Sequence, residues 1–346
     1  MTDQSHQRSG SQQKRVIVIT GAAGFLGSHL CQWYLSNSDE VVGLDNFSTG
    51  QRLNIELLER QWAAQGKFHF YEFDVTKDWS QFASHLTSEQ KKRITHVMHF
   101  ASPASPPLYQ KLSLETMLVN SLGTERAVAF ADAHGAKVVF ASTSEVYGDP
   151  DRTPQPESYW GNVNSYGQRS CYDEAKRYGE SWIYTSNLRN KTRHSMVRIF
   201  NTYGPRMNPS DGRVIINLLV QAMIGRALTI YGDGTQTRSF CYVDDLVAGI
   251  TKYADQDCLH PMNIGNENEF SILELCQKIQ ELFPEKKLEI NFEPLPADDP
   301  RQRRPDLTRA RTELLGWEPR ISLAQGLEKM KAWLIANPEL IEKIRK

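Results

Sequence analysis

Short apolar runs alternate with segments of helical spacing through about 200 residues, and this alternation constrains the fold more than any other feature of the sequence. The first run, Val16–Ile19, contains only β-branched residues and ends at Thr20-Gly21, which is typical of a strand buried on both faces of a parallel sheet. Similar runs cover residues 41–44, 68–73, 95–100, 137–141 and 193–200. This order predicts an α/β fold built on a doubly wound parallel sheet.

The pattern of secondary-structure signals in the sequence changes after Asn201. Residues 113–133 and 170–188, before it, have helical spacing, whereas glycine and proline divide the later chain into shorter elements. Residues 294–305 are rich in Pro, Asp and Arg and are expected to form an ordered loop. Residues 323–344 return to a helical pattern.

Three regions follow from these changes. We expect a disordered polar tail over residues 1–13, a Rossmann domain over 14–203, and a smaller mixed lobe over 204–346, of which some segments can return to the Rossmann domain. In folds of this kind a ligand binds at the carboxyl ends of the strands. The cleft between the two lobes is therefore the expected site.

Composition excludes several classes of protein. The chain has 346 residues, 40% of them apolar, and a formal net charge of −1, which argues against a broad nucleic-acid surface or a polybasic membrane surface. Its five cysteines are scattered without a C-x-x-C pair, so we expect neither disulfides nor a metal site, and a cytoplasmic location fits best. Residues 16–38 lack Asp, Glu, Lys and Arg, but their glycines favour a strand, turn and helix over a signal peptide or membrane span.

A glycine-rich turn follows the first predicted strand. Gly21 permits the tight turn, Gly24 lets the backbone approach a pyrophosphate, and Gly27 allows the next helix to pack closely on the strand. The N-terminus of that helix offers free N–H groups and a positive dipole end to phosphates. A glycine turn alone is a weak signal, because such turns often connect a strand and a helix.

An acidic residue strengthens this interpretation. Asp45 ends the second predicted strand, 18 residues after Gly27, where a carboxylate can bind the ribose diol of an adenosine and repel a 2′-phosphate. The pattern therefore favours NAD over NADP as cofactor. The alternative is that Asp45 only caps its own turn.

Tyr172 and Lys176 lie four residues apart, on one face of a predicted helix. A phenol is a poor base at neutral pH, but a nearby ammonium group and a positive nicotinamide would lower its pKa. A Y-x-x-x-K pair is common on solvated helices. Its place downstream of Thr143, at the end of a predicted strand, indicates that hydroxyl, phenol and ammonium groups meet at an alcohol that is oxidised.

These motifs together resemble the extended short-chain dehydrogenase/reductase family, which acts on nucleotide sugars. The resemblance runs from about Val16 to Trp333 and is nearest to the UDP-glucuronate decarboxylase group within that family. It rests on the glycine turn, Asp74-Val75, Asn120, Thr143, Tyr172-x-x-x-Lys176, Asn201-x-x-Gly204-Pro205-Arg206, and the segments 101–106, 141–150, 169–174, 236–240, Asp298-Asp299-Pro300 and 303–306.

The resemblance implies a role for each matching residue. Thr143, Tyr172 and Lys176 would handle the proton, and Glu145 would lie near carbon 5 of the sugar. Ser144 stands where the similar dTDP-glucose 4,6-dehydratases have an Asp that protonates the leaving hydroxyl, which disfavours loss of water. The implied cofactor residues are Gly21, Gly24, Phe25, Leu26, Gly27, Asp45, Asn46, Asp74, Val75, Ala101, Tyr172 and Lys176, and the implied substrate residues are Ser102, Arg169, Asn201, Arg206, Arg238 and Arg303.

Arginine suits the diphosphate of such a substrate, because the guanidinium group is planar and permanently charged. Arg206, Arg238 and Arg303 would pair with it, although each could instead be a surface charge. One departure from the family concerns the sugar carboxylate: relatives commonly carry a lysine two residues before Asn120, where this chain has Leu118. Arg169 is our candidate for the missing charge.

The resemblance leaves three functions open. The first is NAD-dependent decarboxylation of UDP-glucuronate to UDP-xylose, with the cofactor recycled. The second is epimerisation or dehydration of another nucleotide sugar. The third is a regulatory protein that binds NAD without catalysis, since one fold hosts many functions. A homodimer is implied as well, with the predicted helices at 113–133 and 170–188 pairing between the two copies.

Overall fold

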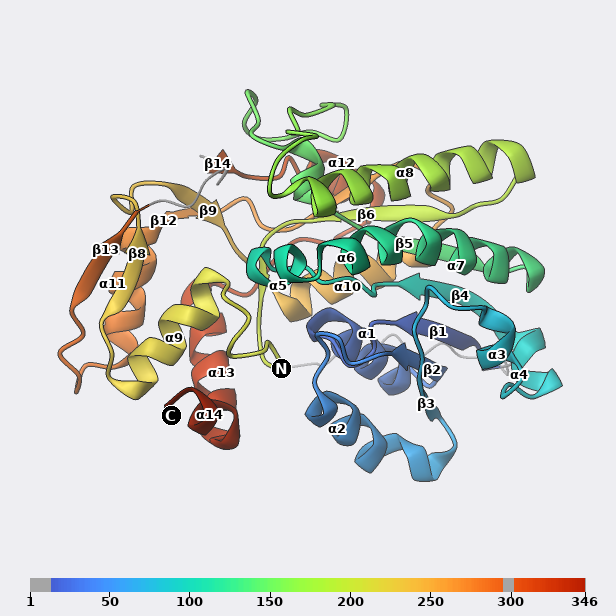
Figure 1. Ribbon diagram of the computed structural model, residues 1–346, viewed down its shortest axis with the longest axis horizontal. Helices are drawn as coiled ribbons and strands as arrows, with labels where there is room; N and C mark the ends of the chain where they lie inside the picture. Colours follow the sequence, from blue (N-terminus) through green and yellow to red (C-terminus); the bar gives the residue numbers. More distant parts are fainter. Residues whose placement is uncertain (1–13, 295–301, 346) are drawn as a thin grey trace.

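The centre of the larger lobe is a seven-stranded parallel sheet, which the computed structural model shows with helices on both faces (Figure 1). Residues 14–294 and 302–345 are described, so the expected tail and Asp298-Asp299-Pro300 lie outside the described residues. The strand order is β11-β6-β5-β4-β1-β2-β3. The strands are β1 (Val16–Thr20), β2 (Glu40–Asp45), β3 (Phe68–Glu72), β4 (Ile94–His99), β5 (Lys137–Thr143), β6 (Ser195–Ile199) and β11 (Met262–Ile264).

The six apolar runs predicted as strands all form strands of this sheet, and the predicted fold class is confirmed. Alternate residues of each strand point to opposite faces, so each face has its own core. Ile17 and Ile19 pack with one cluster, whereas Val16 and Val18 pack with the other. Because both faces of the sheet are covered, polar and apolar residues do not alternate along β1.

Different helices cover the two faces. The first cluster includes α1 (Phe25–Ser36), α2 (Arg52–Trp62) and α10 (Val243–Ala254), and the second includes α3 (Trp79–Ala83), α7 (Leu122–Ala133) and α8 (Ser170–Asn190). Further helices of this lobe are η1 (Ala63–Gln65), α4 (Ser88–Arg93), α5 (Pro106–Lys111), α6 (Ser113–Asn120) and η2 (Ser144–Tyr147). No helix of the described ranges is long and apolar enough to cross a membrane.

Two predicted helices are divided. The helical pattern at 113–133 forms α6 and α7, separated at Ser121, whose hydroxyl donates to the Met117 carbonyl at 2.7 Å. The pattern at 323–344 forms α13 (Leu323–Ala336) and α14 (Glu339–Arg345), because Pro338 cannot continue the first helix. The expected single helices were wrong at these two points.

The smaller lobe lies beyond the carboxyl ends of the sheet strands (Figure 1). It contains α9 (Val214–Ile224), β8 (Leu228–Tyr231), β9 (Thr237–Ser239), β12 (Glu269–Ser271), α11 (Ile272–Leu282), β13 (Ile290–Glu293), β14 (Gln302–Arg303), α13 and α14. A parallel pair, β7 (Thr202–Tyr203) with β10 (Cys241–Tyr242), lies where the chain passes between the lobes. The loop expected at 294–305 therefore includes a short strand, β14, paired with β9.

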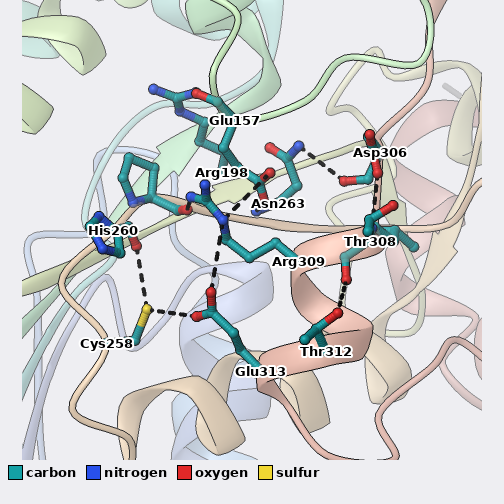
Figure 2. Close-up of polar contacts among 12 residues, drawn as sticks. Glu157, Arg198, Cys258, His260, Asn263, Asp306, Thr308, Arg309, Thr312 and Glu313 are labelled. Carbon is teal, nitrogen blue, oxygen red and sulfur yellow. Dashed lines mark hydrogen bonds and ion pairs between the residues drawn. The ribbon is translucent and has the colours of Figure 1, made fainter.

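Later segments also return to the large lobe. Strand β11 pairs with β6 at the edge of the main sheet, and α12 (Thr308–Glu313) contacts it. Figure 2 shows how polar groups hold this junction: Arg309 lies between Glu157, at 4.0 Å, and Glu313, at 3.9 Å. The backbone N–H of Asn263 donates to Glu157 at 3.0 Å. These contacts hold α12 and β11 against the segment that carries Glu157.

Candidate active site

The glycine turn has a geometry that only glycine satisfies at two of its positions. Gly21 has a φ of +73°, and a Cβ there would lie 2.8 Å from the Phe100 carbonyl oxygen. A Cβ on Gly27 would lie 1.9 Å from the Gly21 carbonyl oxygen. The backbone of α1 thus packs directly against the turn, and its first turn carries no acidic residue that would repel a phosphate.

A cavity of about 320 Å³ opens over this turn. Asp45 lies in it, where its two carboxylate oxygens accept N–H bonds from Ala23 at 2.9 Å and Phe47 at 2.7 Å. The carboxylate caps its turn within the cavity in which a ribose diol would lie. Ten of the predicted cofactor residues line this cavity, namely Gly21, Gly24, Phe25, Leu26, Gly27, Asp45, Asn46, Asp74, Val75 and Ala101. These residues fit NAD.

A second cavity, of about 420 Å³, adjoins the first between the two lobes. Its lining includes Thr143, Ser144, Glu145, Tyr172 and Lys176. Five residues line both cavities, namely Leu26, Phe100, Ser102, Ala104 and Arg213. A ligand in the second cavity therefore lies next to a dinucleotide in the first.

Tyr172, Thr143 and Lys176 meet at the boundary of the Rossmann sheet and α8. Thr143 ends β5, and its hydroxyl forms a hydrogen bond with Tyr172. Lys176 lies one helical turn after Tyr172, with its Nζ 5.6 Å from the centroid of the phenol ring and donating to the Ala141 carbonyl at 2.7 Å. Tyr109 stacks on Tyr172, with ring centroids 4.8 Å apart. The phenol ring thus contacts Tyr109 and Lys176, and its oxygen is bonded to Thr143.

Burial controls the ionisation of this group. Burial raises the pKa of Tyr172 more than the Thr143 hydrogen bond lowers it. Burial also lowers the pKa of Lys176 to about 7. The lowered Tyr172 pKa that we expected from the nearby ammonium is therefore not found: desolvation raises the pKa, and the groups that lower it are Thr143 and Arg213, not Lys176.

Glu145 is bound by two arginines. Arg169, at the start of α8, and Arg303, from β14, each form an ion pair with its carboxylate. Burial is the largest single influence on the pKa of Glu145 and acts upward, but Arg303 and Arg169 together hold that pKa below its usual value. Glu145 is thus a carboxylate, not a carboxylic acid, at neutral pH.

Of the six substrate residues predicted from the sequence, five line the second cavity and one does not. Ser102, Arg169, Asn201, Arg238 and Arg303 all line the second cavity.

Arg206 does not join the other substrate residues. Its φ of +68° turns the side chain toward α1, where it donates to the Ser28 carbonyl at 3.1 Å and to Gln32. We therefore remove Arg206 from the predicted diphosphate set. It ties the inter-lobe segment to α1.

Arg213 was missed by the sequence analysis. It lines both cavities, pairs with Asp211, and its guanidinium carbon lies 5.8 Å from the centroid of the Phe25 ring. Nothing in the sequence marks it, because the residues around it form a loop without periodic pattern. A guanidinium at this boundary can serve the phosphates of either ligand.

The fold, the glycine turn and the Tyr-Lys pair define an NAD-dependent enzyme of the short-chain dehydrogenase/reductase type. The chain belongs to the NAD dependent epimerase/dehydratase family, whose sequence profile matches residues 17–265. It is 43% identical to UDP-glucuronic acid decarboxylase 5 of Arabidopsis thaliana over 321 residues, which cover 92% of this chain and 89% of the relative. It is 42% identical to UDP-glucuronic acid decarboxylase 1 of Danio rerio over 318 residues, which cover 92% of this chain and 72% of the relative.

A solved structure of similar fold is that of UDP-glucuronic acid 4-epimerase from Bacillus cereus in complex with UDP-glucuronic acid and NAD. Its TM-score with this chain is 0.80 and its sequence identity is 29%, over 93% of this chain and 99% of the epimerase. UDP-glucose 4-epimerase of Thermotoga maritima, solved with UDP-glucose, has a TM-score of 0.83 at 25% identity, over 93% of this chain and 99% of that one.

Proposed function

We propose that the protein decarboxylates UDP-glucuronate to UDP-xylose, with NAD recycled in each turnover. The observation that carries the proposal is the position of Tyr172 and Thr143, which reach from the sheet and α8 into a cavity that adjoins the dinucleotide cavity. The decarboxylases at 42–43% identity support the choice of reaction.

In the first step Tyr172 accepts the proton of the sugar 4-hydroxyl. The residues that line the first cavity would hold NAD, which would supply a hydride acceptor for carbon 4 and a hydride donor at the end of the cycle. Burial raises the pKa of Tyr172, so the phenol is protonated in the protein alone. The positive nicotinamide of NAD, when bound, would have to lower that pKa so that Tyr172 loses its proton and the phenolate accepts the one from the sugar. Thr143, whose hydroxyl forms a hydrogen bond with Tyr172, orients the phenol oxygen.

The 4-ketone formed in this step is β to the carboxylate, so carbon dioxide leaves and the electron pair rests in an enolate. Tyr172, now protonated, and Thr143 donate hydrogen bonds that stabilise this oxyanion. Carbon 5 then takes a proton from a water held by Glu145, and the hydroxide that remains leaves to solvent. Tyr172 returns its proton to the 4-oxygen when carbon 4 is reduced again. Overall, the carboxylate is replaced by one proton, and Glu145, being ionised, acts by orienting that water.

The diphosphate of the substrate is assigned to the cations of the second cavity. Arg238 and Arg303 are opposite each other on the paired strands β9 and β14, and both line the cavity. Asn201 and Ser102 supply further hydrogen bonds, and we add Arg213 to this set. Arg169 is assigned to the sugar carboxylate, because Leu118 carries no charge.

We also propose a homodimer and a cytoplasmic location. Leu114 and Leu118 form an exposed apolar stripe on α6, as do Tyr184 and Leu188 on α8, and the two helices lie side by side (Figure 1). A second copy of the chain would cover both stripes in a four-helix interface. Five free cysteines support the cytoplasmic location, because disulfides are rare in a reducing compartment.

The deciding experiment is incubation with UDP-glucuronate and a catalytic amount of NAD, followed by proton NMR and by carbon dioxide release. A pentose signal without net NADH supports the proposal. Conversion to a 4-epimer that keeps its carboxylate favours the alternative, which the Bacillus cereus structure makes specific. Formation of a 4-keto-6-deoxy sugar from a UDP- or dTDP-hexose would identify a dehydratase instead.

A further inference from the structure

The ion pair between Glu145 and Arg169 crosses the reacting end of the second cavity. Glu145 lies in η2, directly after β5, and Arg169 lies one turn before Tyr172 at the start of α8. Their side chains are 17% and 12% exposed. Both residues line the cavity, so a substrate that reaches Tyr172 meets this pair.

The charges of the cavity are unbalanced around this pair. Among the described residues that line the cavity, Glu145 is the only carboxylate, while the cations are Arg169, Lys176, Arg213, Arg238 and Arg303. Glu145 therefore neutralises the cationic end of the site that faces the sugar. A buried guanidinium must keep an anionic partner, because an uncompensated charge in a desolvated site is strongly unfavourable.

Arg169 and Arg303 differ in their other contacts with the protein. Arg303 is 3% exposed and also donates to the Gly148 carbonyl at 3.0 Å and the Ser144 hydroxyl at 3.5 Å, so it holds the turn that carries Glu145. Arg169 leans on the Tyr109 ring, 6.0 Å from its centroid, beside the catalytic phenol. Of the two ion pairs, the one to Arg169 can open without dismantling the turn.

We propose that the carboxylate of the sugar and the carboxylate of Glu145 compete for Arg169. Binding of substrate opens the Glu145–Arg169 pair, and loss of carbon dioxide lets it form again. A neutral sugar cannot replace Glu145, so the exchange selects a uronic acid over its neutral analogues and disfavours retention of the neutral product. The exchange moves no atom between molecules, and it deepens the proposed function, on which the identity of the sugar rests.

The test measures affinities by calorimetry in a Tyr172→Phe background, with NAD present, so that no turnover occurs. Removing the competitor with Glu145→Gln is expected to tighten UDP-glucuronate binding about tenfold and to leave UDP-glucose binding unchanged. Arg169→Met is expected to weaken UDP-glucuronate binding about tenfold, again without effect on UDP-glucose.

Arg177→Met is the matched control. Arg177 lies two turns along α8 from Arg169, donates to the Val146 carbonyl at 2.9 Å, and lies outside the described cavity lining. Its loss removes the same charge from the same helix and should move both affinities equally. Thermal unfolding midpoints identify any variant that fails to fold.

The proposal is overturned if Glu145→Gln weakens or does not change UDP-glucuronate binding, or if Arg169→Met weakens both ligands alike. Carbon dioxide release by the unsubstituted protein separates this result from the reaction itself. Release of carbon dioxide with parallel affinity changes rejects the exchange and keeps the function. Carboxylate-selective affinities without release reject the function and keep the exchange, whereas no binding of UDP-glucuronate rejects both.

Discussion

Tyr172 is the residue on which the proposed chemistry depends. Tyr172→Phe removes the proton acceptor while keeping the ring that stacks on Tyr109, so we expect kcat for carbon dioxide release to fall about 10²–10⁴-fold with NAD and UDP affinity nearly unchanged. Steady-state rates and calorimetry measure the two effects. Tyr184→Phe, on the exposed face of the same helix, should leave kcat unchanged. A Tyr172→Phe enzyme with full activity would exclude the mechanism.

Burial of the Lys176 ammonium group lowers the stability of the folded protein, although the proposed function requires this residue. Its pKa is about 7 in the folded protein and 10.5 in the unfolded chain, so the folded state binds fewer protons between these values and stability rises with pH across that window. The cost of burial is complete below pH 7 and disappears near pH 10.5. Lys176→Met should therefore raise the free energy of unfolding at pH 6 by about 3 kcal/mol, with little gain near pH 10, while it abolishes activity.

Denaturant titrations of the Lys176→Met protein and the unsubstituted protein at several pH values test this sign. The exposed Lys92 offers a control, since Lys92→Met should change stability by less than about 0.5 kcal/mol at every pH. A stability difference that grows with pH instead of shrinking would contradict the assigned direction of the Lys176 pKa.

Individual residues were predictable from the sequence where a local pattern carried them. Tyr172 and Lys176 are joined by helical spacing, and Asp45 is joined to the glycine turn by the length of one strand-helix-strand unit. Arg206 could not be placed, because its positive φ redirects a side chain that the motif alone would assign to the cleft. The raised pKa of Tyr172 depends on burial, which the sequence does not give.

At the scale of elements, substitutions of Gly24 and Gly27 should separate the loss of NAD binding from the loss of helix packing. A Cβ on Gly27 would lie 1.9 Å from the Gly21 carbonyl oxygen, so Gly27→Ala must push α1 from the sheet and cost about 2 kcal/mol or more of stability. A Cβ on Gly24 would lie 3.0 Å from the same oxygen, at an ordinary φ of −74°, so Gly24→Ala should fold.

The expected loss in Gly24→Ala is in NAD affinity, by about tenfold, because the methyl group stands where the backbone approaches the pyrophosphate. Thermal unfolding and NAD titration measure the two properties. Equal losses of stability in both variants, or normal NAD binding by Gly24→Ala, would show that the turn does not cradle phosphate.

Helices and strands were predictable where one period persisted. Buried strands such as β1 stand out as continuous β-branched runs, since both faces of the sheet are covered. The break at Ser121 was not visible, because leucine, valine and alanine continue on both sides of it and a serine hydroxyl bonded to the preceding turn decides it. Strand β11, of three residues, is too short to carry any period.

The whole molecule depends on contacts between distant segments, which no local pattern encodes. The edge strand β11 reaches the sheet after an excursion through the smaller lobe, and Asn263 on it accepts a hydrogen bond from the Tyr147 hydroxyl at 2.8 Å. Arg303 reaches Glu145 from another excursion. The parallel sheet could be predicted, but the contacts of β11 with Tyr147 and of β14 with Glu145, both in η2, could not.

Assembly is the property of the whole molecule that the exposed face of α6 and α8 predicts. Leu114 is 70% exposed and Tyr184 is 68% exposed, and neither lines a described cavity. Two charges buried at an interface between copies are strongly unfavourable. Leu114→Glu combined with Tyr184→Glu should therefore give a monomer in sedimentation velocity, where we expect the unsubstituted chain to sediment as the proposed dimer. An exposed apolar residue of the smaller lobe offers a control. Phe292 lies on β13 and is 58% exposed, and Phe292→Glu should leave the dimer intact. Because α8 also carries Tyr172 and Lys176, the monomer should lose part of its kcat while it keeps its fold, and a fully active monomer would show that the interface does not support the catalytic helix.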